Sequence, residues 1–317
     1  MGKIKMILAV IIPAFKVSRH IETVVKTIPD FIDHIIVVDD HCPESSGKKA
    51  EMLQDRRVIV LYNESNSGVG GATISGYKKA IDLGADIIIK MDGDGQMNSA
   101  YIRDLLKPIE MDYCDYAKGN RFRDFRSLLL MPKIRLIGNA FLSFAIKLAS
   151  GYWDIMDPTN GFTAIRRDTL ESLPLQKISK RYFFESDMLI NLNIMNAVVK
   201  DVPMPAYYGS EKSSLKIPKL LIPFLFHIQK GLAKRVFLKY FIHDFNMISI
   251  YLILGVPMLF FGIISGLVEW IESALTGVPR SAGTIMLVAL PIIVAFQMLL
   301  QAINLDINSI PKKNFRK

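Results

Sequence analysis

The stretch Ile87–Gln96, IIIKMDGDGQ, constrains the fold of this chain more than any other. Its β-branched run is too short for a helix and predicts a buried strand, which ends in Asp92 and Asp94 with one glycine between them. Ligands bind at the carboxyl ends of strands in an open α/β sheet, so both carboxylates are expected at the mouth of a cleft. Such oxygens suit Mg²⁺ or Mn²⁺ completed by substrate phosphates, and an acidic turn without a metal is the alternative.

The first hundred residues alternate apolar strands with helical stretches. This alternation is typical of a parallel, doubly wound α/β sheet. One earlier strand also ends in acids, Asp39 and Asp40, so two strands should deliver carboxylates to the same edge of the sheet. The loop Asn63–Gly71 is expected to open a helix over about 72–83. The other predicted elements are strands over 7–12, 35–38 and 58–62 and a helix over about 18–27.

Half of the 317 residues are hydrophobic, which is high for a soluble protein and indicates that part of the chain lies in lipid. Phe245–Val268 and Ser281–Leu305 contain no charged residue. Each is longer than the roughly 20 residues that span a bilayer core, so two transmembrane helices are predicted. Ile217–Tyr240 mixes apolar residues with Lys and Arg, as in a helix lying on a membrane surface; packing against the catalytic domain is the alternative.

Charge predicts the topology of this membrane region. The connection Glu269–Arg280 holds one positive residue, whereas the flanks on the other side of both spans are basic, which predicts cytoplasmic termini. The net charge of +9 comes without an aromatic–basic pattern, which favours anionic lipid over nucleic acid as a partner. The predicted organisation is a catalytic domain over 1–216, amphipathic helices over 217–244, two spans over 245–308 and a basic tail over 309–317.

Four motifs, IIPAF, VVDD, NSGVGGA and DGDGQ, occur in this order. Together they resemble the family 2 glycosyltransferases of the GT-A fold, over roughly residues 5 to 310. The resemblance implies a nucleotide-sugar donor and a Mg²⁺ or Mn²⁺ ion held by the D-x-D motif. Carried over by residue, it implies a metal site of Asp92, Asp94 and Gln96. It also implies nucleotide contacts at Pro13, Ala14, Phe15, Asp39, Asp40, Asp92 and Gly93.

Gly70 and Gly71 precede the predicted helix and have two interpretations. Their backbone amides could approach a phosphate, as glycine-rich loops do at helix N-termini. They could equally permit only a tight turn.

The chain becomes basic after residue 116. Arg121 follows a strand-like segment and Arg135 enters a helical one, so both could converge on one anion, for which the planar guanidinium is suited. Their spacing, with Asn139 and the DPTNGF motif of Asp157–Phe162, resembles the polyprenyl-phosphate glycosyltransferases. Met131 and Asn160 replace a Trp and a Ser of that pattern. The resemblance implies that Arg121 and Arg135 bind the acceptor phosphate, and Lys216 is a further candidate.

Two further segments each leave two interpretations open. Asp157–Phe162 fits a structural Asx turn or an active-site loop. The segment 181–187 is predicted to open a helix with Glu185 and Asp187 in its first turn, where the helix dipole favours acids. In inverting GT-A enzymes an acid here can be the general base. A phosphate acceptor has a second pKa of about 6, so it is mostly a dianion at neutral pH and needs no base to remove a proton. Positioning is therefore the preferred role for both acids.

The sequence therefore predicts a membrane-bound inverting glycosyltransferase. It would move a sugar from a nucleotide donor, by resemblance a UDP-sugar, to polyprenyl (undecaprenyl) phosphate for cell-envelope glycan assembly at a bacterial-type inner membrane. The spans also offer a surface for homo-oligomers. One alternative is a family 2 enzyme that extends a lipid-linked saccharide at a hydroxyl; another is a non-catalytic membrane component. The candidate catalytic residues are Asp94, Arg121, Arg135, Glu185 and Asp187.

Overall fold

The computed structural model describes residues 5–122, 133–205 and 217–313, and gives the backbone alone at 133–137, 139 and 217–222. The chain forms two compact units. One comprises Met1–Ala233 with Pro311–Lys317, and the other comprises Lys234–Ile310.

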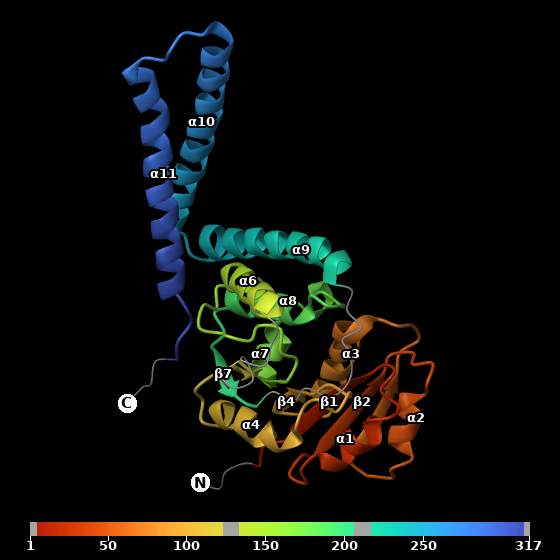
Figure 1. Cartoon of the computed structure of the whole chain (residues 1–317). Helices are drawn as coiled ribbons and strands as arrows, with labels where there is room; N and C mark the ends of the chain where they lie inside the picture. The colour runs from red at the N-terminus through yellow and green to blue at the C-terminus, as the bar shows by residue number, and fades with distance from the viewer. Residues whose placement is uncertain (1–4, 123–132, 206–216, 314–317) are drawn as a thin grey trace. The chain divides into compact units, whose positions relative to one another are not determined.

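A seven-stranded sheet lies at the centre of the first unit (Figure 1), in the order β3-β2-β1-β4-β6-β5-β7. β6 runs antiparallel to β4 and β5, and the other pairings are parallel. The predicted, mainly parallel α/β sheet is confirmed. The strands are β1 (Leu8–Ala14), β2 (His34–Asp39), β3 (Val58–Tyr62), β4 (Ile87–Lys90), β5 (Tyr116–Asn120), β6 (Thr163–Arg166) and β7 (Val199–Pro203).

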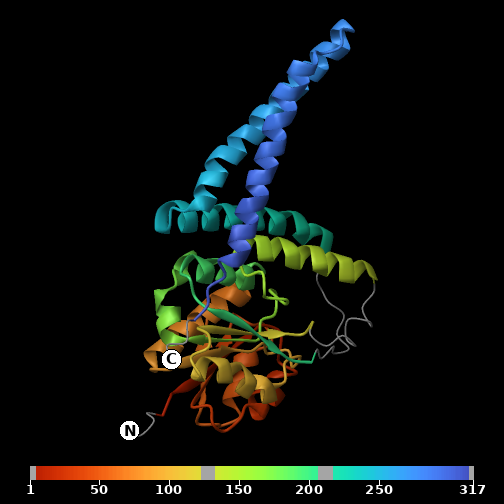
Figure 2. The same cartoon turned by 90° about the vertical axis from the view of Figure 1, so that its left-hand side faces the viewer.

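Helices cover both faces of this sheet, which explains why β1 is apolar throughout. All seven residues of β1 are buried. On one face, Val10 and Ile12 pack in a cluster with side chains of α1 and α4. On the other face, α3 comes so close at Gly76 that a Cβ there would lie 2.4 Å from Ile11 Cγ2. Figure 2 shows these layers edge-on. The helices of this unit are α1 (Ile21–Thr27), α2 (Ser46–Glu51), α3 (Gly68–Asp82), α4 (Ile102–Glu110), α6 (Lys133–Ser150), α7 (Arg167–Ser172), α8 (Phe184–Ile194) and most of α9 (Ile217–Phe237), with 3₁₀ turns at Ser99–Tyr101 and Leu175–Lys177.

Helix α3 begins at Gly68, four residues earlier than the sequence predicts. The reason lies outside the helix, at the end of β2. One carboxylate oxygen of Asp40 accepts a hydrogen bond from Ser67 N at 2.9 Å, and the other accepts one from Gly68 N at 2.8 Å. A carboxylate at a helix N-terminus satisfies otherwise unpaired amides, so this long-range cap lets three further glycines join the first turn of the helix.

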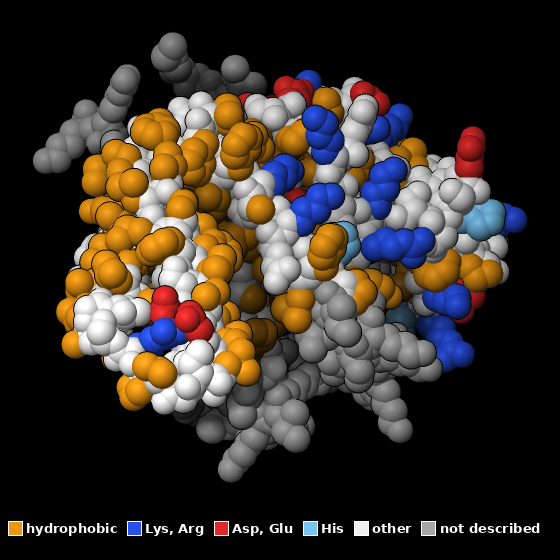
Figure 3. All heavy atoms as spheres, turned by 90° about the horizontal axis from the view of Figure 1, so that it is seen from above, with side chains coloured by type: hydrophobic (Ala, Val, Ile, Leu, Met, Phe, Trp, Pro, Cys, Tyr) orange, Lys and Arg blue, Asp and Glu red, His pale blue; other side chains and the backbone are white. Residues whose placement is uncertain are grey.

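The second unit contains the end of α9 from Lys234, a π-helical turn, Leu238–His243, and two long helices, α10 (Met247–Thr276) and α11 (Ala282–Asn308). Both helices are long and apolar enough to cross a membrane, which agrees with the two predicted spans. Hydrophobic side chains dominate the surface of these helices in Figure 3. α10 continues beyond the predicted end at Val268 and stops at Gly277, whose φ of 67° suits a glycine C-cap.

Candidate active site

Two adjoining pockets lie at the carboxyl ends of the central strands. The larger has a volume of about 930 Å³, and a smaller one of about 120 Å³ lies beside it. Asp92 and Asp94, in the loop after β4, line both pockets. The two acids therefore lie at the mouth of a cleft, as the sequence predicts. The larger pocket is lined by Pro13, Ala14, Phe15, Lys16, Val17, Asp40, His41, Pro43, Asn66, Gly68, Val69, Ala72, Asp92, Gly93, Asp94, Arg181 and Tyr182.

The two acids at the end of β2 lie in different places. Asp40 lines the larger pocket and caps α3, and it also accepts a hydrogen bond from Asn63 Nδ2 at 2.7 Å. Asp39 is buried behind the lining, where its carboxylate accepts hydrogen bonds from Cys42 N and Gly47 N, both at 2.7 Å. Asp39 therefore shapes the loop after β2.

Gly70 and Gly71 face the segment before α8 and are absent from the lining of either pocket. A Cβ on Gly70 would lie 2.7 Å from Ser179 O and 2.7 Å from Phe184 Cδ2, while Gly71 N donates to Lys180 O at 3.0 Å. Close packing of α3 against residues 179–184 thus accounts for Gly70, whereas a Cβ on Gly71 would lie 2.3 Å from Ser67 Cβ at the start of the helix. The tight approach of Gly71 to Ser67 fits the turn that the sequence suggests, and a phosphate contact stays a prediction for both glycines.

The candidate metal ligands gather in the smaller pocket, which Asp92, Asp94 and Gln96 line together. Asp94 Oδ1 accepts a hydrogen bond from Gln96 N at 3.0 Å, which folds the loop back on itself. Across residues 5–122, 133–205 and 217–313, no three His, Cys, Asp or Glu side chains gather closely enough to hold a metal ion. Two carboxylates and an amide fit an ion such as Mg²⁺ or Mn²⁺ that keeps several waters and is completed by substrate phosphates.

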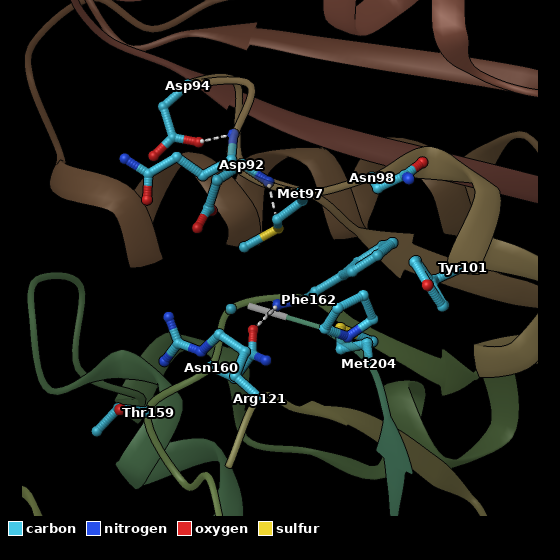
Figure 4. A pocket seen from close by; sticks show the side chains of 13 residues that line it. Asp92, Asp94, Met97, Asn98, Tyr101, Arg121, Thr159, Asn160, Phe162 and Met204 are labelled. Carbon is cyan, nitrogen blue, oxygen red and sulfur yellow. Dashed lines mark hydrogen bonds between the residues drawn. The ribbon is translucent and has the colours of Figure 1, made fainter. Parts of the chain in front are cut away.

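Arg121 lies across the smaller pocket from these acids. In Figure 4, Asp92 and Asp94 lie on one wall, and Arg121 with Asn160 lies on the opposite wall. Arg121 follows β5, and its guanidinium is held by Asp157, with Nε 2.8 Å from Oδ2 and Nη2 3.1 Å from Oδ1. The pocket therefore brings together a predicted phosphate-binding arginine and the predicted metal ligands.

The DPTNGF segment is a turn that serves this site. Asn160 N approaches Asp157 O at 3.3 Å, and Asn160 Oδ1 accepts a hydrogen bond from Phe162 N at 3.0 Å. The Asn160 side chain also donates to Gly119 O at 2.8 Å, and the buried amine of Lys118 donates to Asn160 O. Burial lowers the pKa of Lys118 to about 8. The turn is thus structural, because it is tied to β5, and it also lines the smaller pocket; its active-site role stays a prediction.

The two acids of α8 are confirmed in its first turn and have different partners. Asp187 accepts hydrogen bonds from Ser179 N at 2.8 Å and Asn191 Nδ2 at 2.9 Å, so it holds the segment that packs on α3. Glu185 Oε1 lies 3.1 Å from the amine of Lys90. Burial alone would lower the pKa of Lys90, but the charges of Asp92 and Glu185 outweigh it and raise that pKa, so the amine stays protonated.

Arg181 and Tyr182 are among the residues of the larger pocket that were not singled out from the sequence. Arg181 and Tyr182 immediately precede α8 and are exposed at the pocket. Their position next to Glu185 in RYFFESD was the available signal, but nothing local in the sequence places this segment opposite the end of β1. The predicted contact Lys216 lies outside the described residues. Arg135 lies in the first turn of α6, with only its backbone described.

Comparisons with known proteins show the family and the fold of this chain. The family model described as glycosyl transferase family 2 matches residues 9–173. The UDP-N-acetylglucosamine–dolichyl-phosphate N-acetylglucosaminyltransferase of Methanococcus voltae is 33% identical over 229 residues, which cover 68% of this chain and 90% of that protein. The undecaprenyl-phosphate mannosyltransferase of Micrococcus luteus is 27% identical over 199 residues, covering 61% and 81%.

A solved structure shows the same fold at low identity. Mannosyl-3-phosphoglycerate synthase from Rubrobacter xylanophilus superposes with a TM-score of 0.56 and 14% identity, over 76% of this chain and 77% of that one. The family match covers more than half of the chain and includes most of the residues that line both pockets; Arg181, Tyr182, Met204 and Pro205 lie beyond it. The chain belongs to glycosyl transferase family 2, as the resemblance predicted.

Proposed function

We propose that this chain transfers a sugar from a UDP-sugar to a polyprenyl phosphate, with inversion at the anomeric carbon. The observation that carries the proposal is Arg121, fixed by Asp157 and lying across one small pocket from Asp92 and Asp94. A basic fork opposite two carboxylates is suited to a reaction between an acceptor phosphate and a metal-bound diphosphate.

The larger pocket is the proposed donor site. Its volume of about 930 Å³ suits a nucleotide, with Phe15 and Asp40 beside the base and ribose. Asp92, Asp94 and Gln96 would hold Mg²⁺ or Mn²⁺, which when bound neutralises charge on the leaving nucleoside diphosphate. Arg181 adds a cation at the same pocket and is a further candidate for the diphosphate.

On the acceptor side, Arg121 would orient the lipid phosphate, with Arg135 and Lys216 as further proposed contacts. Glu185 forms an ion pair with Lys90, and Asp187 accepts hydrogen bonds from Ser179 N and Asn191 Nδ2. A phosphate with a second pKa of about 6 is mostly a dianion at neutral pH and attacks without a protein base, so positioning roles for these acids fit this acceptor.

The membrane helices support a lipid acceptor, because an isoprenoid tail keeps its phosphate at the bilayer. The names of the relatives point the same way, as they act on dolichyl and undecaprenyl phosphate. We further propose that the protein is anchored in a bacterial-type inner membrane and that its catalytic domain, over 1–216, lies in the cytoplasm. Helices over 217–244 would lie on that membrane, and the spans over 245–308 would be free to form homo-oligomers.

The test uses the full-length chain purified in detergent. It is incubated with undecaprenyl or dolichyl phosphate, Mn²⁺ and radiolabelled UDP-N-acetylglucosamine, UDP-glucose or GDP-mannose, with and without EDTA. The expected result is metal-dependent label in the organic phase as a lipid monophosphate sugar. Asp94→Asn should reduce this transfer by about 100-fold or more because a ligand at the reacting diphosphate is lost. Asp104→Asn, at an exposed position of α4, is the matched control.

Donor turnover without any lipid product would contradict the proposal. Label entering a lipid-linked saccharide, with none on the monophosphate lipid, would instead identify a sugar hydroxyl as the acceptor. Binding of donor without turnover would favour a non-catalytic membrane component.

A further inference from the structure

Lys90 is a buried charge in the middle of the apolar stretch that builds the site. It ends β4, and its side chain is 1% exposed. An unpaired lysine is costly in such a place, so its charge must be matched by partners of fixed geometry. The sequence alone indicates an apolar strand here and suggests no role for Lys90.

Two carboxylates from different parts of the chain balance the charge of Lys90. Lys90 Nζ lies 2.8 Å from Asp92 Oδ1 and 3.1 Å from Glu185 Oε1. Asp92 is one of the two D-x-D acids, whereas Glu185 belongs to α8 and is only 14% exposed. The amine therefore connects a candidate metal ligand to a helix 95 residues away in sequence.

The DPTNGF turn closes over this pair. A Cβ on Gly161 would lie 2.5 Å from Lys90 Nζ and 2.8 Å from Asp92 Oδ2, so the backbone there rests directly on the ion pair. The same turn carries Asp157, which orients Arg121. Lys90 thus lies where the wall carrying the D-x-D acids meets the turn that positions the arginine.

We propose that Lys90 is a positioning residue that fixes the carboxylate of Asp92 for the metal-bound diphosphate, and that Glu185 acts through Lys90 as its counter-charge. Glu185 then has no role as a general base. This inference rests on the proposed function, because the role of Asp92 as a metal ligand is itself part of that proposal. Partners that orient a metal ligand are worth about 10- to 100-fold in metal affinity or activity.

The test measures metal binding directly. Free Mn²⁺ is followed by electron paramagnetic resonance during titration of the full-length protein in the presence of UDP or GDP, without acceptor. Lys90→Met should weaken Mn²⁺–nucleotide binding by about 10- to 100-fold. Lys107→Met, an exposed lysine of α4, should leave binding unchanged.

A double-mutant cycle separates the two roles of Glu185. If Glu185 acts through Lys90, Glu185→Gln weakens binding, and adding it to Lys90→Met causes no further loss. A general base would behave differently: Glu185→Gln would leave Mn²⁺ binding intact, lower kcat by about 100- to 10,000-fold and abolish the acidic limb of the pH–rate profile. Lys90→Met/Glu185→Gln leaves no unpaired Glu185 charge, so it serves as the binding measurement if Lys90→Met alone does not fold.

The outcomes distinguish this inference from the proposed function. Unchanged Mn²⁺ binding in folded Lys90→Met, or in the double variant, would overturn the inference even if lipid product forms. Absence of lipid product with any donor, combined with weakened binding in these variants, would count against the proposed function alone. A wild-type protein that binds no Mn²⁺ with either nucleotide would overturn the metal site and this inference together.

Discussion

Asp157 accepts two hydrogen bonds from the guanidinium of Arg121 in a bidentate ion pair, with Nε 2.8 Å from Oδ2 and Nη2 3.1 Å from Oδ1. The carboxylate is fully buried, whereas the arginine side chain is 40% exposed. A buried acid therefore sets the plane of an arginine that remains accessible at the pocket, which is the arrangement expected for a phosphate-binding residue.

We expect Asp157→Asn to impair use of the acceptor more than binding of the donor. Asparagine keeps the shape of the side chain but loses the charge-assisted fork, so Arg121 is no longer held in one plane. KM for polyprenyl phosphate should rise about tenfold, equivalent to about 1.4 kcal/mol, with donor affinity nearly unchanged. Steady-state kinetics with each substrate varied check this, with exposed Asp154→Asn as the control. An equal loss of donor affinity would argue against an acceptor role for Arg121.

Gly70→Ala should destabilise the catalytic unit. A Cβ there would meet Ser179 O and the ring of Phe184, both at 2.7 Å, and such overpacking costs about 1–3 kcal/mol. Gly138→Ala is the matched control, because none of the atoms that the structure describes lies within 4 Å of a Cβ added to that helical glycine. Replacing a helical glycine by alanine there should stabilise by up to about 1 kcal/mol. Apparent Tm values measure both. If Gly70→Ala instead weakens nucleotide binding with unchanged Tm, the glycine contacts phosphate.

Stability should depend on pH through Asp201, in β7. Burial raises the pKa of Asp201 to about 6. A hydrogen bond from Met156 N and the charge of Lys118 lower this pKa, but burial outweighs them. An aspartate in the unfolded chain titrates near 3.8, so between these values only the folded protein keeps the proton. The stability that this group contributes is complete below about pH 4 and is lost as the pH rises to about 6.

Asp201→Asn removes this dependence. Relative to wild type, the variant should gain up to about 3 kcal/mol of stability between about pH 4 and pH 7, from 1.36 kcal/mol per unit of pKa. Apparent Tm measured across this range in detergent tests it, with exposed Asp82→Asn as the control. Parallel pH profiles for wild type and Asp201→Asn would show that the buried carboxyl titrates normally.

In the helical unit, Asp306→Asn should be strongly destabilising. Asp306 pairs with Arg235 at 2.7 Å and 3.0 Å, both side chains are at least 93% buried, and the hydroxyl of Tyr240 also donates to the carboxylate. Loss of one partner leaves a buried charge, at a cost of about 3–5 kcal/mol.

Glu272→Gln provides the comparison. Its pair with Arg280 is solvent-exposed on the Glu272 side, so the expected effect is within about 1 kcal/mol. Apparent Tm and monodispersity in detergent report both variants. Arg235→Met/Asp306→Leu, which removes both charges, should recover much of the lost stability. Similar losses from Glu272→Gln and Asp306→Asn would contradict a special role for the buried pair.

The sequence by itself determined the first strands, the two spans and the placement of the D-x-D acids, whereas α2, α4, α7 and β7 were not predicted. An apolar run such as Ile87–Ile89 has few conformations that bury it, and its abrupt end at Asp92 and Asp94 marks a strand edge. The two spans were equally clear, because each uncharged run is longer than the roughly 20 residues that cross the hydrocarbon core. Arg121 and Asp157 were also found from local motifs, although not as partners of each other.

Only the tertiary structure decided what several of these residues do. The start of α3 depends on Asp40, which is 28 positions from Gly68, and Lys90 became a central residue only when α8 brought Glu185 to it. Asp39 and Asp40 are adjacent and chemically identical, yet one shapes a loop and the other lines the pocket. Their roles come from contacts between distant segments, and a side chain's partners in such contacts follow from packing geometry, which no local pattern in the sequence encodes.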